Sequence, residues 1–591
     1  MPPMAASPIT QARELLDSGR ASEAEPLLRK HLRKKPRDIA AIETLGLVMA
    51  ATGRLAEAAE QLVAAAQTPL ATARCMCLAI DAATARGDHD AALAIATMAT
   101  KRFANDGECW HLRGRTELSN ADALAAVHSL EHAHELDPDN DDILGLLADA
   151  DLSKGAFPVP DHWAKVLLER DPNDARNHVR LGNAQRLNDE LDAAKASFEQ
   201  AITLDNTLQG AIAGLAETLE SMGDTNAAAA TLQPAIERGD GGFSLVSAYA
   251  RITQRQSNID TGIHAMEHYL AARRGSPWHT SNILMQLGRA YEKVDRCEDA
   301  FRCWTAGNKA HQGRWSRAAH TTLIEHLEAG FTSAVMEAFP RSTCTDPAPI
   351  FIVGMYRSGT TLTEQVLAAH PMVEPVGESP ALPEAVKLLA QRLGSVDDWP
   401  AGLASATAED LTAAGTAYMA RVRMESPEGE RLVDKLPMNY LSVGAIPLLL
   451  PNAKMLHLVR DDIDTGLSCF SQAFAARMSY TADLHDLGHA IAMERRIMRH
   501  WVETLGIDVH EVRYEELAAE PEGIVRAMLE FLELPWDNAV LRFHESGRVA
   551  ATPSMDQVRE PINTKAVGRA AKFGALLDPL REAIEQARTD D

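Results

Sequence analysis

Small apolar residues recur along the first part of the chain at a constant interval, within segments of helical periodicity. Alanines stand at multiples of 34 residues from the first of the series, at Ala24, Ala58, Ala92, Ala126, Ala194 and Ala228. A second series in one phase places small residues at Gly46, Gly114, Ala148, Gly182 and Ala216, and turn prolines share the interval at Pro36, Pro138 and Pro172. The pattern predicts repeated helix pairs over about residues 8 to 240, in which small residues let neighbouring helices approach closely.

This repeat resembles the tetratricopeptide repeat, whose helix pairs stack into a superhelix with a concave groove. The phase slips after about residue 240, and the stretch FPVP at 157–160 interrupts one unit. Gly288 and Ala300 nevertheless keep the spacing of twelve that separates Gly46 from Ala58. We therefore expect one or two divergent helix pairs to complete a solenoid over residues 1–335.

A different pattern begins after the turn-rich segment RSTCTDPAP at 341–349. Short apolar runs that read as buried strands lie at 350–354, 431–434, 454–459 and 508–513, and helical segments alternate with them. That alternation is typical of a parallel α/β sheet. The predicted fold class is thus multidomain, with an all-α repeat solenoid over 1–335, a linker over 336–349 and a P-loop-like α/β domain over 350–591.

Composition and charge narrow the classes of function. Of the 591 residues 46% are hydrophobic, and 83 acidic against 58 basic residues give a formal net charge of −25, which disfavours sequence-independent binding to nucleic acid or anionic lipid. The seven cysteines lack a zinc-site spacing, so we interpret them as reduced core residues and expect no metal. No apolar run approaches the roughly 18 residues that a membrane span needs, and the opening residues lack a signal-peptide pattern, so we expect a cytoplasmic location.

The run IFIVGMYRSGTTL at 350–362 reads as a strand, a glycine-bearing loop and a helix start, an arrangement that wraps an anion. Gly354, Gly359, Thr360 and Thr361 fit the phosphate-loop pattern, except that Thr360 stands where the lysine belongs. An ordinary ATPase or kinase is therefore disfavoured. Arg357 lies inside the loop, where its guanidinium can neutralise a transferring group or the oxygen that the group leaves.

The segment PIFIVGMYRSGTTL, followed by HPMVEPVGES, resembles the 5′-phosphosulfate-binding region of sulfotransferases that use 3′-phosphoadenosine 5′-phosphosulfate (PAPS) as the donor. The likeness is greatest to bacterial repeat-containing sulfotransferases and to protein-tyrosine sulfotransferases. By this resemblance the loop residues Arg357, Ser358, Gly359, Thr360 and Thr361 bind the donor, and Glu378, counted from Arg357 without gaps, is the catalytic carboxylate.

Further segments carry the same resemblance. PNAKMLHLVRDDIDTGLSCFSQAF at 451–474 is similar to the 3′-phosphate-binding segment, which assigns Arg460 and Ser468 to that phosphate, and Lys435 in VDKLPMNY matches a lysine placed near the sulfate. The stretch 552–573 resembles the closing loop of the family. The donor-binding candidates in this stretch are Ser554, Arg559 and Arg569. Tyr514, which follows a predicted strand, is a further donor-binding candidate.

The resemblance implies transfer of a sulfuryl group to an acceptor hydroxyl, with Glu378, Arg357 and Lys435 as the catalytic residues. A peptide or protein with tyrosine suits the repeat groove, but a glycan acceptor stays open, and the groove would equally serve a protein partner or self-association. Two alternatives remain: a non-catalytic scaffold that holds a nucleotide, and a P-loop phosphotransferase.

Three other features have simpler interpretations. His370 before Pro371 is a second candidate base, which we interpret as a helix-terminating residue. His485 and His489 share a helical spacing with metal sites, but the missing H-E-x-x-H pattern favours a solvated helix. The arginines at 494–499 are expected on an exposed helix face beside carboxylate partners.

Overall fold

The structure is a computed structural model that describes residues 7–120, 122–154, 158–239, 241–256, 258–272, 277–310, 315–395, 399–426, 429–474, 476–545 and 561–589. The chain divides into two compact units, Met1–Gln256 and Ser257–Asp591. Within the described ranges, no helix combines the length and the apolar character needed to cross a membrane. All seven cysteines fall in those ranges and are unpaired, three of them buried and four partly buried.

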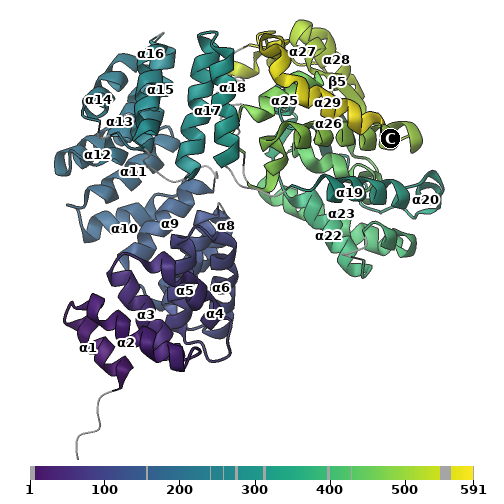
Figure 1. The fold of residues 1–591 in the computed structure, drawn as a ribbon. Helices are drawn as coiled ribbons and strands as arrows, with labels where there is room; N and C mark the ends of the chain where they lie inside the picture. Colours follow the sequence, from purple (N-terminus) through teal and green to yellow (C-terminus); the bar gives the residue numbers. More distant parts are fainter. Residues whose placement is uncertain are drawn as a thin grey trace, which may run out of the picture. The chain divides into compact units, whose positions relative to one another are not determined.

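The first unit is a succession of helix pairs (Figure 1). They are α1 (Pro8–Asp17), α2 (Ala21–Lys34), α3 (Ile39–Ala51), α4 (Ala59–Ala66), α5 (Ala73–Ala85), α6 (His89–Arg102), α7 (Gly107–Ser119), α8 (Ala123–Leu136), α9 (Asp141–Ser153), α10 (His162–Arg170), α11 (Ala175–Leu187), α12 (Leu191–Leu204), α13 (Gln209–Ser221), α14 (Thr225–Glu237) and α15 (Phe243–Arg255). Several begin at an aspartate whose side chain accepts a hydrogen bond from the first-turn amides, as Asp38, Asp88 and Asp106 do.

The periodic small residues lie where the helices meet, as predicted. The six alanines of the main series are at most 4% exposed. A methyl group added at Gly114 would lie 2.5 Å from Leu130 Cγ, and one added at Gly182 would lie 2.9 Å from Phe198 Cζ. A larger residue at either position would force the paired helices apart. The all-α repeat architecture of the N-terminal region is confirmed.

The second unit opens with further helices: α16 (Ile259–Ala271), α17 (Pro277–Lys293), α18 (Cys297–Ala310), α19 (Arg317–Gly330) and α20 (Ser333–Ala338). The predicted divergent pair is formed by α17 and α18, with Gly288 against the buried Trp304. Ile324, Leu327 and Phe331 of α19 and the residue after it share a core with strand residues. The predicted boundaries at 335 and 350 stay predictions, but the compact unit that holds the sheet begins earlier, at Ser257.

Five parallel strands form the sheet: β1 (Pro349–Gly354), β2 (Val373–Gly377), β3 (Arg431–Asp434), β4 (Lys454–Val459) and β5 (His510–Arg513), in the order β2-β3-β1-β4-β5. Four of them match the predicted strands, whereas β2 was not predicted. It lies at the sheet edge, is only half-buried and contains Pro375, so it lacks the continuous apolar run of a central strand.

Helices cover both faces of the sheet. They are α21 (Thr360–Ala368), α22 (Ala381–Arg392), α23 (Ala408–Glu425), α24 (Ile446–Leu449), α25 (Asp462–Phe470), α26 (Leu484–Arg499), α27 (Tyr514–Ala519), α28 (Pro521–Phe531) and α29 (Asp578–Thr589). Alternate residues of β1 enter different cores. Ile350 and Ile352 pack with residues of α21, α27 and α28, whereas Phe351 and Val353 pack with residues of α19, α22, α23 and α26.

Candidate active site

The loop after β1 has the backbone of a phosphate-binding loop. Gly354 and Gly359 both have positive φ angles, 142° and 109°, and so does Arg357 between them at 69°. A methyl group at Gly359 would lie 2.7 Å from Tyr514 Cδ2, so this position requires glycine on both counts. Helix α21 begins at the next residue, and the Ser358 hydroxyl donates back to Met355 O at 2.7 Å. The loop thus brings a helix N-terminus to the end of a central strand, a position suited to an anion.

Each of the five strands leads into one candidate residue at its carboxyl end. They are Arg357 in the loop after β1, Glu378 after β2, Lys435 after β3, Arg460 after β4 and Tyr514 after β5. The carboxyl ends of parallel strands meet at one edge of the sheet, which is where α/β proteins bind ligands. Because β3 lies between β2 and β1, the lysine and the glutamate are neighbours on one side of the loop, while β4 and β5 place Arg460 and Tyr514 on the other.

Lys435 and Glu378 are in direct contact. The Nζ of Lys435 lies 2.7 Å from Glu378 Oε1, and the lysine side chain is only 1% exposed. About a third of the Glu378 side chain, 35%, stays accessible to solvent. Glu364 of α21 lies on the other side of the lysine, 3.8 Å from Nζ. Burial raises the pKa of the Glu364 carboxyl to about 7, despite the opposing effect of Lys435.

Arg357, Ser468 and Arg460 form a second group. Arg357 Nε donates to Ser468 Oγ at 3.1 Å, and Arg460 Nη1 donates to Arg357 O at 3.2 Å. The Arg460 guanidinium also lies 4.8 Å from the centre of the Tyr514 ring, and its buried Nε has no hydrogen-bond partner among the described residues. Desolvation lowers the pKa of Arg357 to about 10, and nearby arginines act in the same direction. The group is therefore a concentration of positive charge with an unmet donor.

The C-terminal candidates separate into two sets. Ser554 and Arg559 lie outside the described residues. Arg569 is described, and it donates to both carboxylate oxygens of Glu292 at 2.6 and 2.7 Å and to Ser471 Oγ at 3.2 Å. Asp464 of α25 accepts hydrogen bonds from the amides of Gly568 and Ala570 at 2.6 and 2.7 Å. Asp464 thereby fixes the turn that carries Arg569 beside Ser471, one helical turn after Ser468.

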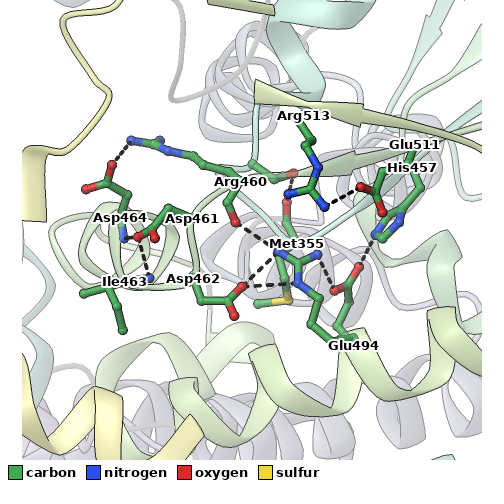
Figure 2. A network of polar contacts seen from close by, with 12 residues as sticks. Met355, His457, Arg460, Asp461, Asp462, Ile463, Asp464, Glu494, Glu511 and Arg513 are labelled. Carbon is green, nitrogen blue, oxygen red and sulfur yellow. Dashed lines mark hydrogen bonds and ion pairs between the residues drawn. The ribbon is translucent and has the colours of Figure 1, made fainter. Parts of the chain in front are cut away.

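A network of polar contacts between β4 and α26 stabilises the end of β4 (Figure 2). His457 Nε2 lies 2.7 Å from Glu494 Oε1, and the other oxygen of Glu494 accepts from Arg495. Arg495 in turn donates to Arg460 O and to Asp462, each at 3.0 Å. Although burial opposes it, the charges of Arg495 and His457 hold the pKa of Glu494 below its ordinary value. The network fixes the backbone of the residue that bears the Arg460 side chain.

This network corrects one prediction. The 494–499 segment was expected on an exposed helix face, but Glu494 is fully buried, Arg495 and Arg496 are partly buried with side chains 16% and 21% exposed, and only Arg499 is exposed. The carboxylate partners were expected and are present, since Arg496 pairs with Glu328 at 2.6 Å. The expectation of exposure holds for Arg499 and is wrong for Glu494, because the packing of α26 on the sheet supplies the partners that make burial of a charged residue tolerable.

The hydrogen-bond partners of His370 and His489 lie outside the candidate site. His370 follows α21 and its Nε2 lies 2.8 Å from Pro535 O, which agrees with a helix-terminating role. His489 lies on α26 beside Thr321, at 3.3 Å. No group of three or more histidine, cysteine, aspartate or glutamate side chains suited to a metal ion occurs in the part of the chain that the structure describes.

Several residues of the site were not predicted from sequence. Glu364 and Asp464 owe their place to partners far along the chain. Asp464 lies inside the segment 451–474 singled out above, and Glu364 is a charged residue in an otherwise apolar segment after the glycine loop, so the sequence held a signal for each. The structure thus adds a buried carboxylate and a loop anchor to the predicted set.

Comparison with known proteins relates this chain to two families. The sequence profile of the sulfotransferase family matches residues 349–538, and that of the tetratricopeptide repeat matches residues 175–208, which are α11 and α12. An uncharacterized protein of Aquifex aeolicus is 38% identical over 309 residues, 51% of this chain and 41% of the relative. Protein-tyrosine sulfotransferase A of Caenorhabditis elegans is 31% identical over 37% of this chain and 60% of the relative.

The chain spans less than two thirds of the length of these two relatives. A provisionally named protein-tyrosine sulfotransferase of Caenorhabditis briggsae is covered further, with 30% identity over 37% of this chain and 79% of the relative. The region that the sulfotransferase profile matches, residues 349–538, contains the glycine loop and the strand ends that carry the candidate residues. Through this region, and with a tetratricopeptide-repeat array before it, the chain belongs to the sulfotransferase family.

Proposed function

We propose that this protein is a sulfotransferase that moves the sulfuryl group of PAPS to an acceptor hydroxyl. The observation that carries the proposal is the 2.7 Å contact between Lys435 Nζ and Glu378 Oε1, at the ends of adjacent strands beside a glycine loop that has no lysine of its own. Sulfuryl transfer needs a base for the acceptor and a cation for the leaving oxygen, and this pair supplies both types of group.

The donor is a substrate with two anionic ends, and the site has features suited to each. The glycine loop and the N-terminus of α21 suit the 5′-phosphosulfate. Arg460 is 5% exposed and has a buried Nε without a partner among the described residues, an unmet donor that a phosphate oxygen would satisfy. Ser468 and Arg569 lie around the same helix end, so we assign the 3′-phosphate to this side.

In the proposed reaction the acceptor oxygen bonds to sulfur while the bond between sulfur and the bridging oxygen of the 5′-phosphate breaks. Glu378 takes the proton of the acceptor hydroxyl. Lys435 stabilises the charge that develops on the leaving phosphate oxygen, and Arg357 stabilises the sulfuryl group. The products are a sulfate ester and adenosine 3′,5′-bisphosphate, and no further co-reactant is consumed.

For the acceptor we propose a peptide or protein that carries tyrosine. Two observations support this class: the named relatives are protein-tyrosine sulfotransferases, and the N-terminal unit is a repeat array of a kind that binds extended peptides. Transfer of labelled sulfate to a tyrosine peptide, and not to its phenylalanine counterpart or to an oligosaccharide, is the expected result. Transfer to the oligosaccharide alone would contradict the peptide assignment.

Two other functions compete with this proposal. A P-loop phosphotransferase is disfavoured because Thr360 replaces the lysine that clamps β- and γ-phosphates. A scaffold that holds a nucleotide without turnover is disfavoured because Arg357, Glu378 and Lys435 are all present and Lys435 contacts Glu378. Dependence on a 3′-phosphate separates sulfuryl transfer from phosphoryl transfer.

The first test is a calorimetric titration of the full chain with adenosine 3′,5′-bisphosphate in magnesium-free buffer. We expect the wild type to bind and Arg460→Ala to bind at least about tenfold more weakly, which corresponds to a loss of about 1.4 kcal/mol. Arg526→Ala is the matched control, because this arginine is half-exposed on α28 and pairs with Glu522. A well-folded wild type that does not bind would contradict the proposed function.

A further inference from the structure

Helix α17 lies outside the region that the sulfotransferase profile matches, yet it packs in the same compact unit as the sheet. Its Gly288 accommodates Trp304 of α18, and the Trp304 ring lies 5.4 Å from that of Phe573 in the C-terminal segment. Trp304 is fully buried. The α17–α18 pair is therefore packed against the segment that bears Arg569.

Two residues of α17, one helical turn apart, make polar contacts with the candidate site. Glu292 holds Arg569 through two hydrogen bonds of 2.6 and 2.7 Å. Arg289 Nη1 donates to Gln472 Oε1 at 3.4 Å. Gln472 follows the end of α25 and lies four residues after Ser468, which accepts from Arg357. One end of α25 thus contacts α17 on one side and the glycine loop on the other.

The charges around this helix end are mainly positive. Arg357, Arg460, Arg569 and Arg289 gather there, and among the described residues Asp464 pairs with Arg460 and Glu292 pairs with Arg569. The effect of Arg289 on Arg357 is long-range repulsion, which is one of the influences that lower the pKa of Arg357. Arginine clusters of this kind are costly without an anion to compensate them.

We propose that Arg289 is a donor-binding residue that binds the 3′-phosphate, so that the helix pair α17–α18 completes the donor site. The inference rests on the proposed function. The 3′-phosphate is favoured over the 5′-phosphosulfate because Arg289 reaches the Ser468 to Gln472 helix end, beside Arg569, while the 5′-phosphosulfate is assigned to the glycine loop. A guanidinium suits a phosphate because it offers several N–H donors in one plane.

The test compares two nucleotides that differ only in the 3′-phosphate. Adenosine 3′,5′-bisphosphate and adenosine 5′-monophosphate are titrated into the full-length wild type, Arg289→Ala, Arg289→Lys and Arg302→Ala. We expect Arg289→Ala to weaken bisphosphate binding about 10- to 30-fold and monophosphate binding less than about threefold. Arg289→Lys should recover part of the loss because it keeps the charge. Arg302→Ala should match the wild type, because this side chain is 78% exposed on α18 and pairs with Asp299.

The outcomes separate this inference from the proposed function. If the wild type binds the bisphosphate and Arg289→Ala binds it equally well, the inference is wrong and the proposed function stands. An equal loss for both nucleotides would also overturn the inference, since it places the effect elsewhere than on the 3′-phosphate. If the wild type binds neither nucleotide, both fail. Thermal unfolding of each variant shows whether a loss of binding is a loss of folding. If Arg289→Ala is unfolded, the two nucleotides are compared on Arg289→Lys, which keeps the charge.

Discussion

At the scale of single residues, the buried cation Lys435 is shared between two carboxylates of different character. Glu378 is accessible and lies 2.7 Å from the lysine, whereas Glu364 is 4% exposed and lies 3.8 Å away. One oxygen of Glu364 has no hydrogen-bond partner among the described residues. A buried carboxyl with one unmet oxygen favours the protonated form, because a neutral group costs less to desolvate. Burial therefore favours the protonated form of Glu364.

This difference predicts a pH dependence of stability. The pKa of Glu364 is raised to about 7 in the folded protein from an ordinary 4.5, so the folded state binds this proton more tightly than the unfolded state does. Stability then falls as pH rises from 4.5 to 7 and changes no further above that, by about 3 kcal/mol in all. Glu364→Gln cannot ionise and should lack this fall. Melting temperatures from pH 4.5 to 8 measure it, with the exposed Glu522→Gln as control, and parallel curves for wild type and Glu364→Gln would contradict the assignment.

At the scale of the elements, parallel strands and the turns that follow them assemble the site. Each strand delivers one candidate side chain, and the sheet order decides which of them become neighbours. The tightest turn is that between β1 and α21, where Gly359 faces the ring of Tyr514 at the start of α27. The loop after one strand is thus shaped by the residue after another.

Gly359→Ala tests the contact between the glycine loop and Tyr514. The added methyl group would lie 2.7 Å from Tyr514 Cδ2 at a φ of 109°, so it meets both a steric clash and a strained backbone. We expect a loss of about 2–4 kcal/mol of unfolding free energy and weaker binding of adenosine 3′,5′-bisphosphate. Gly394→Ala is the control, since its φ of 65° carries backbone strain but its surroundings are open. Urea denaturation compares the two, and an equal cost for both would show that the contact with Tyr514 is unimportant.

At the scale of the whole molecule, the helices before the sheet belong to two different structures. Those up to Gln256 form one compact unit, and those from α16 onward fold with the sheet. Phe331 shows why: it is 1% exposed, shares the core of the sheet domain and meets the Trp501 ring edge-on at 5.3 Å. Sequence periodicity relates α17 and α18 to the repeats, while their packing relates them to the catalytic sheet.

Two truncated chains test whether the sheet domain needs the helices before the sheet in order to fold. A fragment of residues 257–591 should fold and bind adenosine 3′,5′-bisphosphate like the full chain. A fragment of residues 350–591 lacks Ile324, Leu327 and Phe331, and the loss of each buried side chain costs about 1.5–3 kcal/mol, so it should not fold stably. Thermal unfolding followed by circular dichroism, together with the same titration, measures both. A stable, binding-competent shorter fragment would show that the helices before the sheet are dispensable.

Local sequence was sufficient for a large part of this protein. The 34-residue interval, the strands β1, β3, β4 and β5 and the glycine loop could all be predicted, because helix periodicity, apolar runs and glycine conformation depend on neighbours in the chain. The residues that follow strands could be predicted for the same reason, and Arg357, Glu378, Lys435 and Arg460 do lie at the carboxyl ends of the strands of one sheet. Their roles in the reaction stay predictions.

Folding was needed for everything that depends on partners distant in sequence. The edge strand β2 exists because β3 pairs with it, and Glu494 tolerates burial because His457 and Arg495 meet it. Glu364 has its raised pKa because folding buries it, against the opposing effect of Lys435 from the end of β3, and Arg289 reaches Gln472 because α17 packs on the C-terminal segment. Hydrogen bonds, ion pairs and desolvation act over a few ångströms of space, and the order of residues along a chain does not specify those distances.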